Sequence, residues 1–168
     1  DTATNDFVGA VNSNGANVTL ADGTGGIILG NTSATGNLVV TSTGGAITDT
    51  PTAVTAVSGN SNLTGTSITL GDTATDAFNT ATLTFNSTGA VNITEDSNML
   101  VTGINSAGTL VLQTPADMDS VSGAVITVTG TAVQLLAGGT IGGLEVGEVA
   151  KTSLNGISYN AFGTLTAN

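Results

Sequence analysis

The sequence predicts an all-β protein, and three observations carry this prediction. Thr, Val, Ile and Ala dominate short stretches in which apolar and polar residues alternate, as they do on a half-buried strand. Clusters of Gly, Asn and Asp interrupt these stretches roughly every ten residues and are typical of turns. Long stretches lack Glu, Lys, Arg and Gln, the residues that favour surface helices. We therefore expect many short strands joined by tight turns.

The alternating pattern places these strands one by one along the chain. Expected strands are Phe7–Val11, Asn17–Ala21, Gly26–Leu29, Asn37–Thr41, Ala46–Thr48, Ala53–Val57, Ser67–Leu70, Ala81–Asn86, Ala90–Thr94, Met99–Thr102, Thr109–Gln113, Ala124–Thr129, Ala132–Leu136, Ile157–Asn160 and Gly163–Thr166. The segment Gly143–Leu154 suits either a helical turn or another strand. The whole chain, residues 1–168, is expected to form a single all-β domain, either alone or as a repeat fragment of a larger protein.

An internal resemblance favours stacked coils over two packed sheets. Thr35–Thr50 and Thr80–Asp96 both contain a strand, a Ser-Thr-Gly turn, an Ala, and a second strand followed by an acidic residue. Aligned on Leu38 and Leu83, the shift is 83 − 38 = 45 residues, which corresponds to two coils of about 22. Leu110–Thr129 is a weaker third copy, and this spacing predicts roughly seven or eight coils. A parallel β-helix is favoured; a β-sandwich surface-filament subunit is the alternative.

Composition excludes several classes of function. Twelve acidic residues and one basic residue, Lys151, give a formal net charge of −11, which excludes a nucleic-acid partner and disfavours anionic lipid surfaces. The longest apolar runs, such as Val133–Ala137, are too short for a membrane span. The chain has no His, no Cys and no Arg, so catalytic triads, His- or Cys-bound metals and phosphate clamps cannot be built. We expect a protein that is not an enzyme.

Paired acidic residues are the remaining candidates for chemistry. Asp117 and Asp119 flank Met118, so in a strand both carboxylates point to one face, about 6–7 Å apart. That separation would suit an inverting glycosidase, although Thr114–Ala116 resembles a turn and no aromatic residue accompanies the pair. Calcium is the better expectation, because it prefers carboxylate oxygens. The candidate calcium ligands are Asp117 with Asp119, Glu95 with Asp96, Asp72 with Asp76, and Glu145 with Glu148. Alternatively, these residues only cap turns.

Threonine and asparagine patterns point to surface properties. Thr-x-Thr steps, such as Thr41/Thr43 and Thr64/Thr66, place hydroxyls on one face of a strand. Stacked on successive coils, they would form a ladder similar to that of β-helical ice-binding proteins; the simpler explanation is that Thr suits strands. Asn-x-Ser/Thr sequons, the acceptors of N-glycosylation, occur at Asn17, Asn31, Asn62, Asn86 and Asn92.

The first fifty residues resemble the repeat region of filamentous-haemagglutinin-like, large secreted bacterial adhesins. The matching residues are Asn5-Asp6-Phe7 with Gly9 and Val11, Asn17-Val18-Thr19-Leu20, Ile28-Leu29-Gly30, Gly36-Asn37-Leu38 and Gly44-Gly45-Ala46-Ile47-Thr48. The resemblance implies a right-handed parallel β-helix on the bacterial cell surface. The Asn-Pro-Asn-Leu type of secretion signature is absent, so the chain resembles shaft repeats rather than the secretion module.

These observations lead to one expected function and two alternatives. We expect a non-catalytic extracellular structural or adhesive protein: a β-solenoid shaft, or a filament subunit that self-associates through strand edges at its ends. Its other partners would be host or cell-surface glycans or proteins. The alternatives are a calcium-dependent surface-layer or pilin-like β-sandwich subunit, and a carbohydrate-binding or carbohydrate-cleaving β-helix.

Overall fold

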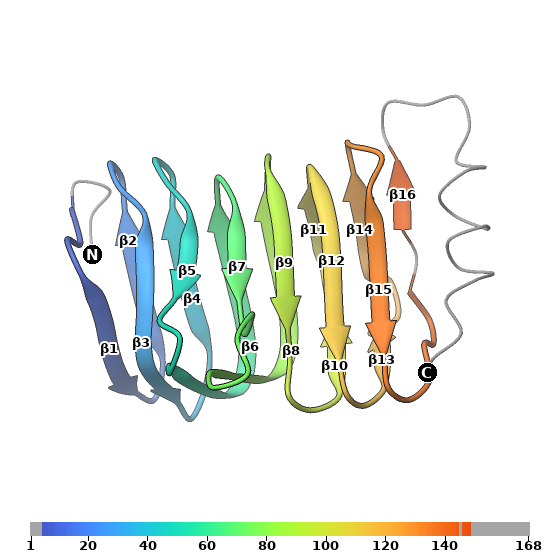
Figure 1. The fold of residues 1–168 in the computed structure, drawn as a ribbon, viewed down its shortest axis with the longest axis horizontal. Coiled ribbons are helices and arrows are strands. Elements are labelled where there is room, and N and C mark those ends of the chain that lie inside the picture. The colour runs from blue at the N-terminus through green and yellow to red at the C-terminus, as the bar shows by residue number, and fades with distance from the viewer. Residues whose placement is uncertain (1–4, 145, 149–168) are drawn as a thin grey trace.

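The computed structural model describes residues 5–144 and 146–148, and within these ranges the chain forms strands, turns and bends but no helix. Sixteen strands join in a single parallel sheet that winds into a β-solenoid of about 6 turns. Figure 1 shows the strands side by side, running across the long axis of the molecule. The strands are β1 (Ala10–Gly15), β2 (Val18–Asp22), β3 (Ile27–Ala34), β4 (Leu38–Ser42), β5 (Ile47–Asp49), β6 (Val54–Gly65), β7 (Ile68–Leu70), β8 (Ala77–Ser87), β9 (Ala90–Thr94), β10 (Met99–Val101), β11 (Ile104–Ala107), β12 (Thr109–Thr114), β13 (Met118–Ser120), β14 (Val125–Val128), β15 (Val133–Ala137) and β16 (Val146–Glu148).

The pairing divides the solenoid into three sides. Side 1 is formed by β2, β4, the second half of β6, the second half of β8, β11, β14 and β16. Side 2 is formed by the first half of β3 and by β5, β7, β9, β12 and β15. Side 3 is formed by β1, the second half of β3, the first halves of β6 and β8, and then β10 and β13. The long strands β3, β6 and β8 turn a corner and so belong to two sides each.

A narrow aliphatic core runs along the axis because alternate residues of every strand point inward. Ile47 of β5 pairs with Ile27 on one side and Ile68 on the other, and all three are fully buried. On side 1, Leu63 pairs in the same way with Val40 and Phe85. Burying a side chain of this size stabilises the fold by about 1.5–3 kcal/mol. Val, Ile and Leu side chains form most of this interior, together with Phe78, Phe85, Met99 and Met118.

The predicted repeat is confirmed on side 1. Leu38 pairs with Ser61, and Ser61 pairs with Leu83, so the shift of 45 residues is two coils, as expected. The intervening coil has Ser61 in this column, which explains why no single-coil repeat is visible in the sequence. Coil length varies: Ile28 lies 18 positions after its partner Ala10, whereas Ser61 lies 23 after Leu38.

Other parts of the prediction need correction. The β-sandwich alternative is wrong, because every strand pair described is parallel. The third copy is out of register, since Leu110 stacks on Val91 and Val133 of side 2 and not on Leu83. Strands β11 and β13 were not expected, and β6 is a single strand from Val54 to Gly65 where only its first part was expected.

Some predictions fall partly or wholly outside the described residues. These are the strands Ile157–Asn160 and Gly163–Thr166, most of Gly143–Leu154, and the coils beyond the sixth turn. Within Gly143–Leu154, the strand alternative is confirmed for Val146–Glu148.

Glycines allow the turns between sides 1 and 2 to stack closely. A Cβ atom on Gly45 would lie 2.5 Å from the backbone carbonyl of Gly25 and from the nitrogen of Gly26. The same turn in later coils places Gly108 against Gly89, and Gly130 against Gly108. The backbones of neighbouring coils therefore touch at this corner, which leaves no room for side chains.

Candidate functional site

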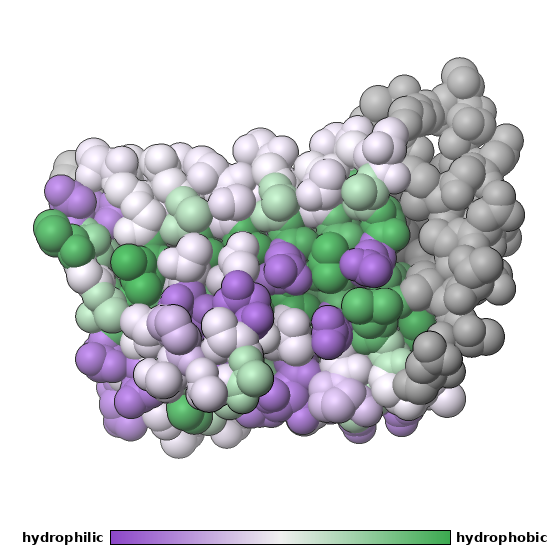
Figure 2. Space-filling model, in the orientation of Figure 1, coloured by the Kyte–Doolittle hydropathy of each residue, from purple (hydrophilic) through white to green (hydrophobic). Residues whose placement is uncertain are grey.

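Most of the acidic residues gather along one corner of the solenoid. Seven of the 12 acidic residues lie near the corner between sides 2 and 3 on four successive coils: Asp49 ends β5, Asp119 lies in β13, and Asp72, Asp76, Glu95, Asp96 and Asp117 lie in the turns between the strands. We call this set the acidic corner. Its members reach between neighbouring coils: Gly71 donates its N–H to Asp49 Oδ2 at 2.9 Å, and Phe78 donates to Asp96 Oδ2 at 2.9 Å. Figure 2 shows a hydrophobic green band across this view of the molecule, with purple hydrophilic residues within it and below it.

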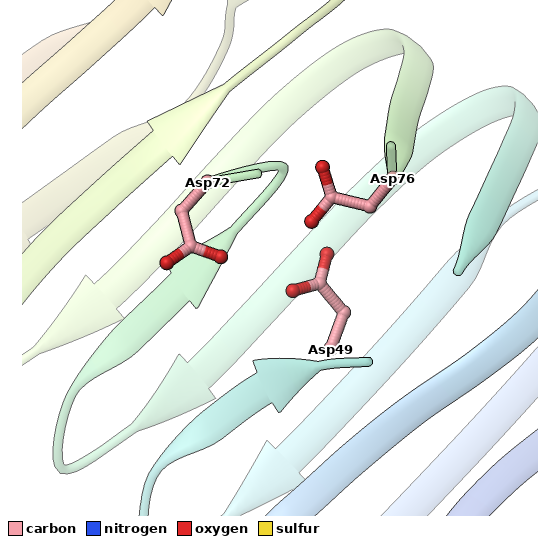
Figure 3. A group of neighbouring side chains, drawn as sticks. All are labelled: Asp49, Asp72 and Asp76. Carbon is pink, nitrogen blue, oxygen red and sulfur yellow. The ribbon is translucent and has the colours of Figure 1, made fainter. Parts of the chain in front are cut away.

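Three of these carboxylates form a compact group. Oxygen atoms of Asp49, Asp72 and Asp76 all lie within 4.8 Å of one another, and the three side chains point toward one another in Figure 3. Asp72 is exposed, Asp49 is half-buried and Asp76 is buried. The Asp76 carboxylate also accepts the Thr73 N–H at 3.2 Å, which fixes the turn between β7 and β8.

The environment of Asp49 disfavours its negative charge. Its register partner is Leu29, so Asp49 occupies an otherwise apolar, inward-facing column. Burial raises the pKa of Asp49 to about 6, with repulsion from Asp76 and Asp72 adding to the effect and the Gly71 N–H opposing it. A hard cation such as Ca²⁺ would relieve this repulsion, because it takes carboxylate oxygens as ligands. Of the predicted calcium pairs, Asp72 with Asp76 is therefore brought together, with Asp49 added from the preceding coil.

Glu95 and Asp96, the second predicted pair, have different environments. The Glu95 side chain is fully buried, whereas Asp96 is exposed. Glu95 Oε1 accepts the Thr80 N–H at 3.0 Å, and Asp96 Oδ2 accepts the Phe78 N–H. Both carboxylates thus satisfy N–H groups along the first half of β8. The pair therefore has a structural role at this edge, and calcium binding by it stays a prediction.

Burial is costly for the Glu95 carboxylate. Its Oε2 atom is buried and has no hydrogen-bond partner, while Oε1 also accepts a bond from the Ser97 hydroxyl at 3.3 Å. Burial raises the pKa of Glu95 to about 7, opposed by the Thr80 and Ser97 hydrogen bonds and supported by repulsion from Asp96. Burial therefore favours the protonated form of Glu95 up to a higher pH than is usual for a glutamate.

Asp117 and Asp119 lie as the alternation predicts, both exposed and on either side of the buried Met118. Asp117 Oδ1 accepts the Thr140 N–H at 2.7 Å and the Thr140 hydroxyl at 3.0 Å, and these bonds lower the pKa of Asp117. Asp119 accepts the Ser120 N–H at 2.7 Å. Asp117 therefore connects two coils. These contacts do not test whether Asp117 and Asp119 bind calcium or act as a catalytic pair, so both remain predictions.

Two asparagine ladders at the other corners were not anticipated from the sequence. In the first, Asn17 Oδ1 accepts the Asn37 N–H and Asn37 Oδ1 accepts the Asn60 N–H, both at 2.9 Å. In the second, Asn12 Oδ1 accepts the Asn31 N–H at 2.8 Å, and Asn31 Oδ1 accepts the Val54 N–H at 3.0 Å. The signal was present as asparagines spaced one coil apart. The ladders also occupy the side-chain oxygens of Asn17 and Asn31, two of the five sequons.

Further features bear on binding. An open hollow of about 440 Å³ lies on side 3 and is lined by residues that include Asn12, Asn14, Asn31 and Val54. Phe78 and Phe85 are fully buried, so neither offers a platform for sugars. Within the described ranges, no helix suitable for crossing a bilayer is found.

Comparison with known proteins adds no further identification: no family model matches the sequence, and neither a curated protein nor a solved structure shows significant similarity to it.

Proposed function

We propose that the chain is a non-catalytic, extracellular structural or adhesive β-solenoid that serves as a shaft or as the subunit of a surface filament. One observation carries this proposal. At the N-terminal end of the described coils, β1 pairs only with β3 and β2 pairs only with β4. Apart from Asn5, which bonds to Ala21 and Gly23, no described residue pairs with the other edge of β2, so most of this edge is open. An open edge of parallel strands accepts another strand through main-chain hydrogen bonds.

The core at this end supports continued stacking. Val18 and Leu20 point inward on β2 and are only 7% exposed, and their column continues through Leu38 and Val40 of β4. A further coil would extend the same apolar column and the same ladder. A contact between unlike ends of two solenoids is head-to-tail, and its repetition produces an open filament and not a closed dimer.

The extracellular and adhesive parts of the proposal have separate support. The chain lacks cationic residues apart from Lys151, and its polarity comes from Thr, Ser, Asn and Gly. Its first fifty residues resemble the shaft repeats of secreted bacterial adhesins. A partner on a cell surface, either a glycan or a protein, follows from this resemblance.

A single N–H group on β2 allows a test of end-to-end stacking. Val18 donates its N–H to Asn37 at 2.9 Å, so the N–H of the next residue, Thr19, points to the open edge by alternation. Thr19→Pro removes that donor and should leave the bonds between β2 and β4 in place. Thr19→Ala keeps the N–H and is the matched control.

The readout is the length of assemblies seen by electron microscopy. We expect wild type and Thr19→Ala to form rods, and Thr19→Pro to shorten them or leave single particles. Rods of equal length in all three proteins would contradict stacking through this edge.

A further inference from the structure

The outward face of side 1 carries no charged residue between β2 and β14. Its first row is Thr19, Val39, Asn62, Thr84, Ile104 and Val125. Its second row is Ala21, Thr41, Thr64, Asn86, Ser106 and Thr127. The next outward positions add Thr43, Thr66, Thr88 and Thr129, all exposed. We call this set the uncharged face.

The uncharged face contrasts with the rest of an acidic molecule. The formal net charge is −11, and the seven residues of the acidic corner lie near the corner between sides 2 and 3. Molecules with a large net charge of one sign repel their own copies. When two copies approach through the uncharged face, no carboxylates repel each other across the contact, because the face carries none. Charge therefore selects this side for contact between copies.

The chemistry of the face suits a protein partner. Threonines present methyl and hydroxyl groups together, and Ile104 and Val125, which pair with one another, are 75% and 41% exposed. A shallow depression of about 310 Å³ crosses the middle of the face, lined by residues that include Thr43, Thr64, Thr66 and Thr88. Methyl groups and aliphatic side chains gain by leaving water, which favours contact with another apolar and hydroxyl-rich surface.

The size of the face sets the strength of such a contact. Six strands about 4.8 Å apart span about 29 Å, and five residues along each strand span about 17 Å. One copy can therefore bury about 500 Å², and a pair about 1,000 Å², the lower limit for a specific interface. The contact should be weak and concentration-dependent.

We propose that the uncharged face is a lateral interface at which two copies of this chain pair side by side. The same surface on both copies makes the contact, as in a two-fold dimer. It differs from the open edges of β1 and β2, so lateral pairing does not depend on end-to-end stacking.

Thr64→Asp places a charge in the second row, and Thr69→Asp is its matched control. Both threonines are half-buried and point outward, but Thr69 lies in β7 on side 2. Sedimentation equilibrium of the full chain and both variants, from about 10 µM to about 1 mM, measures pairing. We expect wild type to self-associate and Thr64→Asp to weaken association about tenfold or more, with Thr69→Asp within about twofold of wild type. Added salt should strengthen wild-type pairing by screening the net charge.

Three results would overturn the proposal. The first is a wild type that stays monomeric over the whole range. The second is an equal loss of association in Thr64→Asp and Thr69→Asp. The third is binding of monomeric wild type to microcrystalline cellulose, if Thr64→Asp abolishes this binding. That result would show that the face binds a neutral polysaccharide. Electron microscopy separates this test from that of end-to-end stacking, because Thr64→Asp should still form single rods.

Discussion

Replacing Glu95 with Gln tests the cost of burying a carboxylate inside the solenoid. The folded protein raises the pKa of Glu95 from 4.5 to about 7, mainly through burial. The folded state therefore binds this proton more tightly than the unfolded chain does. The resulting stabilisation is fully present below pH 4.5 and is lost as pH rises from about 4.5 to about 7.

The magnitude follows from the two pKa values of Glu95. Each pKa unit corresponds to about 1.4 kcal/mol, so ionised Glu95 costs the folded state about 3 kcal/mol above pH 7. Gln keeps an oxygen that can accept the bonds from Thr80 and Ser97 but carries no charge. We expect Glu95→Gln to match wild type near pH 4 and to be about 3 kcal/mol more stable near pH 8.

Urea unfolding at both pH values, followed by far-ultraviolet circular dichroism, measures this difference. Other carboxylates also titrate: the raised pKa of Asp49 acts in the same direction as Glu95. Hydrogen bonds lower the pKa of Asp22 and Asp117, so their contribution is present above about pH 4 and lost on acidification. Comparing variant with wild type at each pH cancels these effects.

Asp96→Asn is the control for Glu95→Gln, because it removes a charge from the neighbouring exposed residue. The Glu95 carboxyl stays in this variant, so the pH dependence that its burial causes should remain. A Glu95→Gln protein whose stability differs from wild type by the same amount at both pH values would refute the reasoning.

Three further predictions follow from contacts between coils. Gly45→Ala should destabilise the fold by about 1–3 kcal/mol or more, because its Cβ would lie 2.5 Å from the preceding coil; Gly9→Ala, with no atom within 4 Å, should have little effect in the same thermal melts. Asn37→Ala should cost about 1 kcal/mol by removing the acceptor for the Asn60 N–H, whereas Asn14→Ala should be close to neutral in urea unfolding; equal effects would contradict a role for the ladder. Calcium about tenfold above its Kd should stabilise wild type by about 1.4 kcal/mol in melts with and without EDTA. If calcium binds the group in Figure 3, Asp76→Asn should abolish this stabilisation. If calcium binds Asp117 and Asp119 instead, Asp117→Asn should abolish it. Identical wild-type melts with and without EDTA would rule out both sites.

Much of the fold could be predicted from local patterns. Alternation of apolar and polar residues located most of the strands, and the matching segments around Leu38 and Leu83 predicted the two-coil shift. Strand β13 was missed because Asp119 is unfavourable in strands and Pro115 precedes it closely, yet pairing with β10 forms it. The continuation of β6 beyond Val57 was missed because Gly59 and Asn60 resemble a turn, while in the structure they bend a strand around a corner.

The candidate site was harder to predict, because its residues come together through register between coils. Asp72 and Asp76 are close in the sequence, but Asp49 joins them only because β5 stacks beneath β7. Likewise, nothing local to Glu95 shows that its side chain turns inward and bonds to Thr80 of the preceding coil. Because coil length varies between 18 and 23 residues, the sequence alone does not show which residues of neighbouring coils lie next to each other.

Cryo-electron microscopy of assembled rods tests the central claim most directly. If the chain is a shaft built of parallel coils that stack end to end, power spectra of the rods should show a repeat of about 4.8 Å along the rod axis. Rods whose 4.8 Å repeat runs across the axis, or particles that never elongate at high concentration, would contradict this account.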